Sequence, residues 1–476
     1  MQTWKQIRDR EDGKLPSRTF ANRIKSNRIS NLQLSNHKDI VSSHKGSINS
    51  LQIDYSEGRY LLSAASDSTV AVYDIQRPTN YEGCGVISKH TSIFVVDKQH
   101  ESGHKYAVSS AIWYPIDTGL FITASYDHHI NVWDTNTTKV VVNFKMPGKV
   151  YKTAMSTLAT SHMLIAAGTE DVQVRLCDIA SGAFAHTLSG HRGASPCKYL
   201  LLNHASSLSL LFNATCLVLH HMCSVIADGV MNVEWSTSSE WVLITGGCDG
   251  AIRFWDIRRA GCFLLLDQSR TQLGRRPPIL KHSAITKDSS TKLRTAHKKH
   301  ANGGGSKQLP IGRVPSKGPM KQRLHPGMLS TQDRATAHYG AVTGLKVTEN
   351  GMYLLSTGSD SRLRLWDVES SCDTLVNFET VRLQTSKPIQ LATAQDSALV
   401  FVPCMRTVKA FDMWSGNTYA TLRGHYECVN ACWFNQQDQE LYTGGNDRQI
   451  LVWSPARLIA DQMDEGANED QDNWSS

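Results

Sequence analysis

Residues 104–134, HKYAVSSAIWYPIDTGLFITASYDHHINVWD, decide the fold. Three runs in this stretch alternate apolar and polar residues, and polar turns separate them at 115–119 and 126–128. An alternation with a period of two is typical of β-strands, so the stretch predicts three antiparallel strands. His104 opens it, Asp127 lies 23 residues later, and Trp133, followed by Asp134, lies 29 residues after the histidine.

The same His…Asp…Trp-Asp frame recurs along the chain. Its other copies are His44…Asp67…Tyr73, His191…Asp249…Trp255, His338…Asp360…Trp366 and His425…Asp447…Trp453. Two degenerate units, at 163–178 and 399–412, keep only the last two strands. A unit of about 40 residues that cannot bury both faces alone predicts stacked repeats. Seven units predict a closed ring of four-stranded blades, because closure removes exposed sheet edges.

The frame has a structural explanation. A histidine before the first strand can hydrogen-bond the aspartate in the turn between the second and third strands, and a Ser or Thr and the Trp can complete a buried network. We therefore interpret these residues as structural. A His–Asp–Ser group in this setting is weak evidence for a hydrolase, and the sequence has no phosphate-binding loop, nucleophile motif or metal-ligand spacing. We expect no enzyme activity, no metal and no cofactor.

The fourth unit carries 35 extra residues. His191 to Asp249 is 58 residues and 58 − 23 = 35, while His191 to Trp255 is 64 and 64 − 29 = 35. The surplus corresponds to Gly193–Ala227, a segment rich in Leu, Ser, Cys and His without strand alternation. We interpret it as a retained intron or gene-model error. The alternatives are a functional insert and a transmembrane span, and polar residues such as Asn203 and Asn213 disfavour the span. If translated, the segment is expected to separate His191 from its blade.

Residues 268–335 hold the positive charge of the chain. From 270 to 334 there are 15 Lys and Arg against two Asp, which gives +13, so the rest of the +7 chain sums to −6. With three consecutive glycines and scattered prolines, this loop is expected to be disordered. It is either a solvated insertion or a nuclear-import or weak nucleic-acid contact.

The remaining segments lie at the ends. We divide the chain into a helical docking segment (1–40), the ring (41–455) and an acidic, disordered tail (456–476). Ser17 is a candidate N-cap for a short basic helix that carries Phe20, Ile24 and Ile29 on one face. The helix is either a frayed end or a docking element for a protein partner.

The cysteine pattern and the N-terminal stretch predict an intracellular protein. It has 11 cysteines but no CxxC pair, which indicates reduced thiols rather than a disulfide framework. The charged N-terminal stretch lacks the apolar run of a secretion signal.

The repeated frame resembles the WD40-repeat family and implies an all-β fold, a seven-bladed β-propeller with a short N-terminal helical extension. Several stretches resemble, more narrowly, the Cockayne syndrome group A family of WD40 proteins, across most of 44–267 and 335–455 and at the extreme C-terminus. These stretches are INSLQIDYSEGRYLLSAASDSTVAVYDI (48–75), WYPIDTGLFITASYDHHINVWDTNT (113–137), WDIRRAGC (255–262), DTLVNF (373–378) and EDQDNWSS (469–476). The segment Gly193–Ala227 and the long basic loop depart from that pattern.

The resemblance implies a substrate receptor of a cullin-4 RING ubiquitin ligase. Such a receptor docks on the damaged-DNA-binding adaptor of cullin-4 and serves transcription-coupled nucleotide-excision repair in the nucleus. Its further partners would be a Cockayne syndrome group B type ATPase and stalled RNA polymerase II, with no membrane and no direct sequence-specific nucleic acid. The competing expectation is a general nuclear scaffold in chromatin or RNA metabolism, because a propeller alone does not fix function.

The resemblance also suggests which residues would bind the adaptor. Adaptor-binding members often carry Trp-Asp-x-Arg at the end of a blade, which matches Trp255, Asp256 and Arg258 here. The plainer alternative is that Arg258 is a solvated loop charge. Phe20 and Ile24 match the family's docking helix in role, without a sharp motif.

Overall fold

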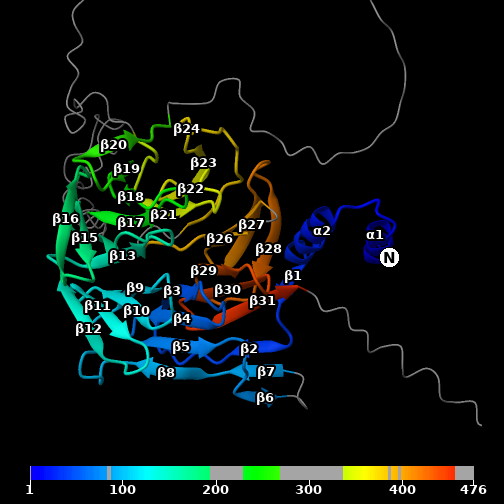
Figure 1. Cartoon of the computed structure of the whole chain (residues 1–476), viewed down its shortest axis with the longest axis horizontal. Coiled ribbons are helices and arrows are strands. Elements are labelled where there is room, and N and C mark those ends of the chain that lie inside the picture. Colours follow the sequence, from blue (N-terminus) through cyan, green and yellow to red (C-terminus); the bar gives the residue numbers. More distant parts are fainter. Residues whose placement is uncertain are drawn as a thin grey trace, which may run out of the picture.

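The computed structural model describes residues 2–82, 87–192, 229–268, 336–383, 387–394 and 398–455. Its strands form separate sheets arranged around a central axis, with two helices beside the ring (Figure 1). Within the described residues, six sheets have four strands each and one has seven. The prediction of an all-β propeller is confirmed. The prediction of seven four-stranded blades is wrong in one respect, because six sheets have four strands and the remaining sheet has seven.

The six four-stranded sheets use antiparallel pairs throughout. The first and second sheets contain β3 (Ile48–Ile53), β4 (Tyr60–Ala65), β5 (Val70–Asp74) and β8 (Ser92–Val96), and β9 (Val108–Trp113), β10 (Leu120–Ser125), β11 (His129–Asp134) and β12 (Val140–Lys145). The third and fourth sheets contain β13 (Val150–Met155), β14 (Leu164–Thr169), β15 (Gln173–Asp178) and β16 (Ala183–Ser189), and β17 (Val230–Trp235), β18 (Val242–Gly247), β19 (Ile252–Asp256) and β20 (Cys262–Leu265). The fifth and sixth sheets contain β21 (Val342–Val347), β22 (Tyr353–Gly358), β23 (Leu363–Asp367) and β24 (Cys372–Asp373), and β25 (Ala392–Ala394), β26 (Leu399–Cys404), β27 (Thr407–Asp412) and β28 (Thr418–Arg423). The two degenerate units thus have first and fourth strands that their sequences did not reveal.

The seven-stranded sheet joins the two ends of the chain. Its C-terminal part is β29 (Val429–Asn435), β30 (Glu440–Gly445) and β31 (Ile450–Pro455), and its N-terminal part is β1 (Leu32–Leu34), β2 (Lys38–Ile40), β6 (Asn80–Glu82) and β7 (Ile87–His90). β1 pairs antiparallel with β31, and β2 meets the same strand at Ile40 and Ile450. The N-terminal strands β1 and β2 therefore pair with β31 and extend the sheet that the last three strands of the chain form.

The apolar core lies between neighbouring sheets. Leu62 and Val72 of one sheet pack with Phe121 and Trp133 of the next, and all four are buried. Because a sheet here is covered on both faces, inner strands such as β10 are buried along most of their length, whereas the outermost strand β12 alternates. The expected alternation therefore belongs to the outer strands.

Four sheets contain the predicted polar network. In each of these sheets His Nδ1 contacts the Asp carboxylate, His Nε2 contacts a Ser or Thr hydroxyl, and Trp Nε1 donates to the same hydroxyl. In that order, the distances are 2.8, 2.7 and 2.7 Å for His104, Asp127, Thr123 and Trp133, and 3.0, 2.7 and 2.8 Å for His191, Asp249, Thr245 and Trp255. They are 3.0, 2.7 and 2.8 Å for His338, Asp360, Ser356 and Trp366, and 2.8, 2.8 and 2.9 Å for His425, Asp447, Thr443 and Trp453. We call each set a tetrad.

The tetrad contacts are compatible with an imidazole that carries its proton on Nδ1. The indole N–H donates to the hydroxyl, the hydroxyl donates to Nε2, and the Nδ1–H donates to the carboxylate. In the fourth sheet, burial alone would raise the pKa of Asp249, but the hydrogen bond from His191 and further contacts bring it below its usual value. The contacts of the tetrad thus favour the ionised form of Asp249.

The first unit departs from the tetrad. His44 Nδ1 contacts Thr69 Oγ1, which donates to Asp67, so threonine bridges the histidine and the aspartate. Tyr73 stands in the tryptophan position, and its hydroxyl accepts the backbone N–H of Ser43. The prediction of a direct contact between His44 and Asp67 is therefore wrong.

The fourth sheet is intact. Residues 193–228 lie outside the described residues, but His191 and Asp249 meet across that interval. The expectation that the extra segment separates His191 from its blade is therefore wrong, because His191 contacts both Asp249 and Thr245 of the fourth sheet.

The tetrad hydroxyl can be tested with Thr245→Val. This change removes a buried acceptor for Trp255 and the donor to His191, so we expect a loss of about 1–3 kcal/mol and a lower melting temperature. Thr187→Val, at an exposed position of β16, is the matched control and should change stability by less than about 0.5 kcal/mol. Equal melting temperatures for the two variants would contradict the role of the hydroxyl.

A second prediction concerns acid. Burial lowers the pKa of His44 to about 4, opposed by the charge of Asp67, whereas an unfolded histidine titrates near 6.5. Between these values the unfolded chain holds more protons, so the contribution of His44, up to about 3 kcal/mol, is complete above pH 6.5 and is lost as pH falls toward 4. Melting curves should show a shallower fall from pH 7 to 4.5 for His44→Gln than for the wild type, with the exposed His186→Gln as control.

Candidate protein-docking site

The ring has two chemically different faces. Because strands in each sheet are antiparallel, the turns after the first and third strands lie at one end and the turn after the second strand lies at the other. Arg258 follows β19, the third strand of its sheet, and we call its end the Arg258 face. The opposite end carries the tetrad aspartates, and we call it the tetrad face.

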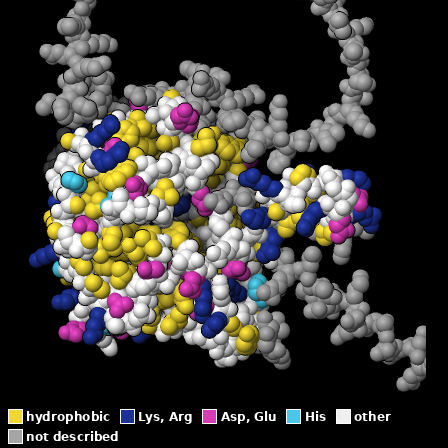
Figure 2. Space-filling model, viewed as in Figure 1, with side chains coloured by type: hydrophobic (Ala, Val, Ile, Leu, Met, Phe, Trp, Pro, Cys, Tyr) yellow, Lys and Arg dark blue, Asp and Glu magenta, His cyan; other side chains and the backbone are white. Residues whose placement is uncertain are grey.

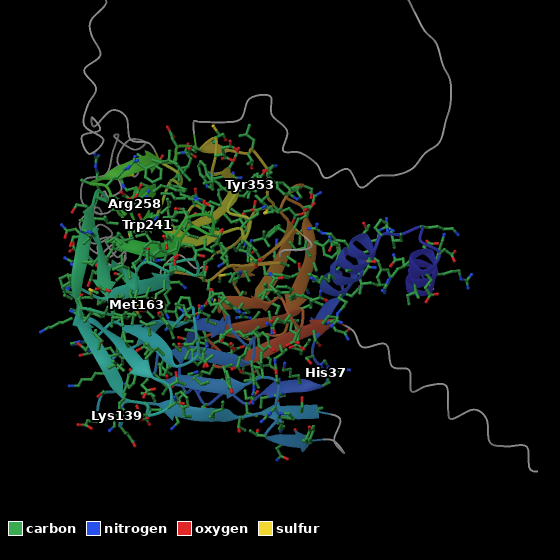
Figure 3. The ribbon with its side chains drawn as sticks, in the orientation of Figure 1. His37, Lys139, Met163, Trp241, Arg258 and Tyr353 are labelled. Carbon is green, nitrogen blue, oxygen red and sulfur yellow. The ribbon has the colours of Figure 1, made fainter. Side chains whose placement is uncertain are left out.

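Arg258 is held rigidly on its face. Its Nε and Nη2 donate to the two carboxylate oxygens of Asp256, both at 2.9 Å. Its guanidinium carbon lies 5.2 Å from the ring centroid of Trp241, and Figure 3 shows both residues at the same edge of the ring. The hydrogen bond from Arg258 lowers the pKa of Asp256. With 54% of its side chain exposed, Arg258 presents the outer edge of a fixed guanidinium.

The other two residues of the motif do not reach the surface. Trp255 is fully buried and donates its indole N–H to Thr245. Asp256 is 8% exposed and engages Arg258. The sequence pattern grouped all three as contacts, whereas the structure leaves Arg258 as the exposed member, with Asp256 holding it and Trp255 packed in the core.

Sequence reasoning missed an aromatic strip beside Arg258. His162 lies 5.3 Å from the Trp241 ring and 5.4 Å from the Trp235 ring, and its Nε2 donates to the carbonyl of Glu240. One signal was available in the sequence, because Trp241 immediately precedes β18 and Arg258 closely follows its hairpin partner β19. The backbone N–H of Ile257 donates to the carbonyl of Trp241 across this hairpin, so Trp241 and Arg258 are near neighbours.

The N-terminal segment forms two helices, α1 (Gln2–Glu11) and α2 (Ser17–Ser30), in place of one. Pro16 precedes α2 without a side-chain cap, so Ser17 begins the helix and is not its N-cap. Arg10 of α1 stacks over the Phe20 ring at 5.3 Å. Phe20 and Ile24 are each half-buried. The helices pack on each other and leave most of α2 outside the ring.

One buried residue anchors α2 to the ring. Ile29 is 3% exposed and packs in a cluster with Leu441 and Trp453 of the seven-stranded sheet. Arg28 Nη2 contacts the carbonyl of Asp438 at 3.4 Å. Asp438 lies in the turn between β29 and β30, so the helices attach at the Arg258 face.

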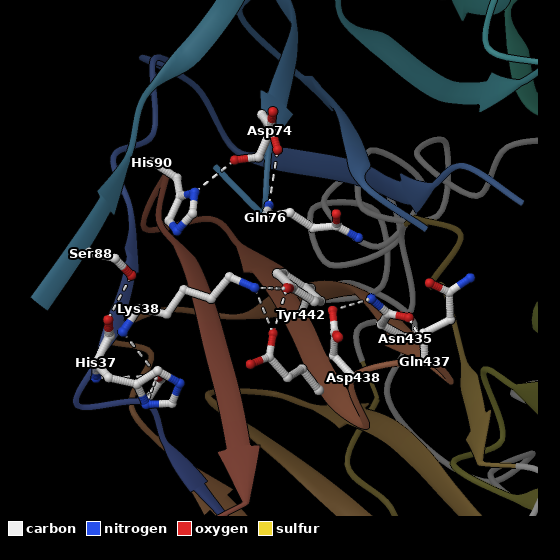
Figure 4. Close-up of polar contacts among 12 residues, drawn as sticks. His37, Lys38, Asp74, Gln76, Ser88, His90, Asn435, Gln437, Asp438 and Tyr442 are labelled. Carbon is white, nitrogen blue, oxygen red and sulfur yellow. Dashed lines mark hydrogen bonds and ion pairs between the residues drawn. The ribbon is translucent and has the colours of Figure 1, made fainter. Parts of the chain in front are cut away.

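A polar junction holds the strand that follows the helices. Lys38 of β2 contacts Glu440 and the Tyr442 hydroxyl, each at 2.8 Å (Figure 4). Lys38 and Glu440 side chains are only 9% exposed, and a cavity of about 810 Å³ lined by polar residues lies beside them. Burial raises the pKa of the Asp438 carboxyl. This junction ties the N-terminal arm to β30.

Apolar side chains are exposed in the turns of the Arg258 face. Tyr55, Ile116, Leu158 and Met352 each follow the first strand of a sheet and are about half-exposed. Figure 2 shows hydrophobic side chains gathered over the same face, with charged groups between them. An extended apolar surface of this kind marks an interaction site.

Several expectations lie outside the described residues. These are the segment 193–227, most of the basic loop 268–335, and the tail 456–476. In the part of the chain that is described, no group of three or more His, Cys, Asp or Glu side chains is placed to hold a metal, and no helix is long and apolar enough to cross a membrane.

Comparison with known proteins gives matches to the repeats and to whole relatives. The WD domain, G-beta repeat pattern fits residues 35–74, 97–134, 216–256, 331–367 and 416–454. WD repeat-containing protein ATCSA-1 of Arabidopsis thaliana is 62% identical over 484 residues, covering 99% of this chain and 100% of that protein. Radiation-sensitive protein 28 of Saccharomyces cerevisiae is 23% identical over 157 residues, 33% of this chain and 25% of that protein. The ribosome biogenesis protein WDR12 homolog of Arabidopsis thaliana is 25% identical over 236 residues, 48% and 46% of the two chains.

The anchoring role of Ile29 can be tested with Ile29→Asp. A charge buried among Leu441 and Trp453 should release α2, so brief trypsin treatment should cleave at Arg23 and Lys25 several-fold faster than in the wild type. Asn27→Asp places the same charge on an exposed position of α2 and should leave the cleavage rate unchanged. Equal rates in the two variants would contradict the anchor.

Proposed function

Because this chain belongs to the WD-repeat protein family, we propose that it is a non-catalytic substrate receptor of a cullin-4 RING ubiquitin ligase. In this proposal it docks on the damaged-DNA-binding adaptor through the Arg258 face. One observation carries the proposal. Arg258 and the attachment point of the N-terminal helices are far apart in sequence but lie on the same face of the ring.

The two elements suit different parts of one interface. A guanidinium that is already oriented by Asp256 and Trp241 loses little entropy when it binds a carboxylate or carbonyl. Helices α1 and α2 stand beside the ring and can enter a groove in a partner, a common mode of peptide recognition. Together they define a wide, two-point contact.

The role in repair rests on relatives. The extensive match is to ATCSA-1, and a more distant relative is called a radiation-sensitive protein. We assign the chain to transcription-coupled nucleotide-excision repair in the nucleus, with a Cockayne syndrome group B type ATPase and stalled RNA polymerase II as further partners. Docking on the Arg258 face leaves the tetrad face, with exposed Tyr106, Tyr339 and Tyr426, for those proteins.

The second candidate function is a nuclear scaffold in chromatin or RNA metabolism. The likeness to a ribosome biogenesis protein favours it. Removal of residues 270–334 separates the two functions: if RNA or DNA binding stays strong and salt-sensitive without the basic loop, the scaffold is favoured, because salt dependence counts phosphate contacts.

Arg258→His and deletion of residues 1–28 test adaptor docking. We expect each to weaken binding of the purified adaptor roughly tenfold or more, because a positioned guanidinium or a docking helix is lost. The deletion ends before Ile29, because removal of 1–40 would also take away β1 and β2, which complete the ring. Biolayer interferometry on proteins with unchanged melting temperatures gives the affinities.

Arg259→His serves as the matched control. Arg259 neighbours Arg258, is 77% exposed, and lies 3.6 Å from Asp256 without the stacked ring. It should bind like the wild type. Unchanged adaptor affinity in both Arg258→His and the deletion would remove the proposal.

A further inference from the structure

The central cavity of the ring, about 490 Å³ in volume, opens on the Arg258 face. The innermost strands of several sheets line it, together with the turns that follow those strands. The side chains of Trp113, Trp235 and Trp433 form part of its wall. The indole N–H groups of Trp113 and Trp235 donate to backbone carbonyls, each at 3.1 Å, so these two residues offer the cavity their apolar ring carbons.

Polar side chains of the wall are bonded within the ring. Gln390 donates to the carbonyl of Leu51 at 2.6 Å and accepts its backbone N–H at 3.1 Å. Gln52 accepts the backbone N–H of Trp113 at 2.9 Å, and Asn232 donates to a backbone carbonyl of β21 at 3.0 Å. Each of these bonds ties one sheet to another, so the groups need no ligand to satisfy them.

The charged groups of the wall leave no positive surplus. Two lysines, Lys152 and Lys346, line the cavity with three carboxylates, Asp54, Glu234 and Glu349. Lys346 Nζ lies 2.9 Å from Glu234 Oε1. Asp54 accepts backbone N–H groups of its own turn, and Glu349 accepts a glutamine N–H at 3.0 Å. An ionised side chain of either sign therefore gains little here, and the attraction of the cavity for a partner lies in its apolar surface.

The mouth of the cavity is apolar. Tyr55 and Leu158 line it and are half-exposed. Tyr55 also meets Trp433 edge to face, with ring centroids 5.9 Å apart. Ile116 and Met352 are exposed in the corresponding turns of the second and fifth sheets. Exposed apolar side chains thus continue inward into the indole wall, and a concave apolar surface of this kind is the usual form of a binding site.

The two proposed attachment points of the adaptor lie on either side of this mouth. Arg258 belongs to the fourth sheet, and the N-terminal helices attach to the seven-stranded sheet through Ile29. These sheets are three places apart in one direction around the ring and four in the other, so they lie nearly opposite each other (Figure 1). A partner that contacts both must therefore cross the mouth.

We propose that the cavity receives an apolar side chain, that of a leucine, isoleucine, methionine or phenylalanine, from a loop of the adaptor. The inference rests on the proposed function and specifies the chemistry at the centre of that interface. An apolar group that enters removes its own surface and the indole wall from water, and this burial favours binding. Binding energy at protein interfaces concentrates in central pockets of this kind, surrounded by polar contacts. Arg258 and the helices supply those surrounding contacts.

Leu158→Asp tests the apolar mouth. A carboxylate at this position must lose its water when an apolar side chain enters, so adaptor affinity should fall roughly tenfold or more. Val141→Asp places the same charge at an exposed apolar position of the outermost strand β12 and should leave affinity unchanged. Biolayer interferometry on variants with wild-type melting temperatures gives the comparison. Equal affinities for the two variants would overturn the inference.

Thr157→Trp separates insertion from contact across the surface. Thr157 is exposed and lines the cavity, so an indole there should obstruct the mouth and weaken adaptor binding roughly tenfold, although it adds apolar surface. Lys139→Trp, in the turn between β11 and β12 at the outer edge of the same face (Figure 3), is the matched control and should not change affinity. Wild-type or tighter binding by Thr157→Trp would show that nothing enters the cavity.

Lys152→Met tests the chemistry of the occupant. An apolar occupant buries the Lys152 ammonium group, which costs free energy, so this variant should bind the adaptor at least as tightly as the wild type. An acidic occupant would lose its counter-ion in the same variant. A fall in affinity of more than about threefold would therefore contradict an apolar occupant.

Photo-cross-linking identifies the occupant. The photoreactive amino acid p-benzoylphenylalanine, placed at position 158, inserts into C–H bonds that lie against it. Mass spectrometry of the complex should find it joined to a leucine, isoleucine, methionine or phenylalanine in a loop of the adaptor. A link to this chain's own residues 456–476 instead would overturn the inference.

The same measurements distinguish this inference from the proposed function. If Leu158→Asp and Thr157→Trp bind like the wild type while Arg258→His binds more weakly, the cavity inference fails alone and adaptor docking stands. If Arg258→His and the deletion of residues 1–28 also bind like the wild type, the proposed function fails with it.

Discussion

A single hydroxyl group links the indole and the imidazole in each tetrad, and the geometry of the ring depends on it. The hydroxyl of Thr123, Thr245, Ser356 or Thr443 accepts from tryptophan and donates to histidine at once. That double role fixes the third strand, the second strand and the turn before the first strand relative to one another. The tetrads therefore set the shape of four sheets, and the turns that carry Arg258 take their positions from sheets held in this way.

Much of the fold was predictable because the tetrad has a fixed spacing. His104, Asp127 and Trp133 set a pattern that found five units, and the contacts follow in four of them. The first unit could not be predicted in detail, because an additional hydroxyl, that of Thr69, lies between His44 and Asp67, and the repeat spacing does not report it. Degenerate units hid their outer strands because β16 and β28 are largely exposed and need no apolar pattern.

The candidate site was predictable in part. The Trp-Asp-x-Arg motif located Arg258, but burial of Trp255 is a tertiary property that spacing alone does not report. Trp241 was not found, since it belongs to no repeat motif and gains its meaning from Arg258, which follows the neighbouring strand.

The joining of β1 to β31 has a consequence for synthesis on the ribosome. Leu32 pairs with Pro455, and Ile29 packs against Trp453, so the N-terminal helices find their seat when more than 420 further residues have been translated. A nascent or prematurely terminated chain carries the helices but not the strand that receives them. The N-terminal helices can therefore be seated on the ring only after β31 has been synthesised.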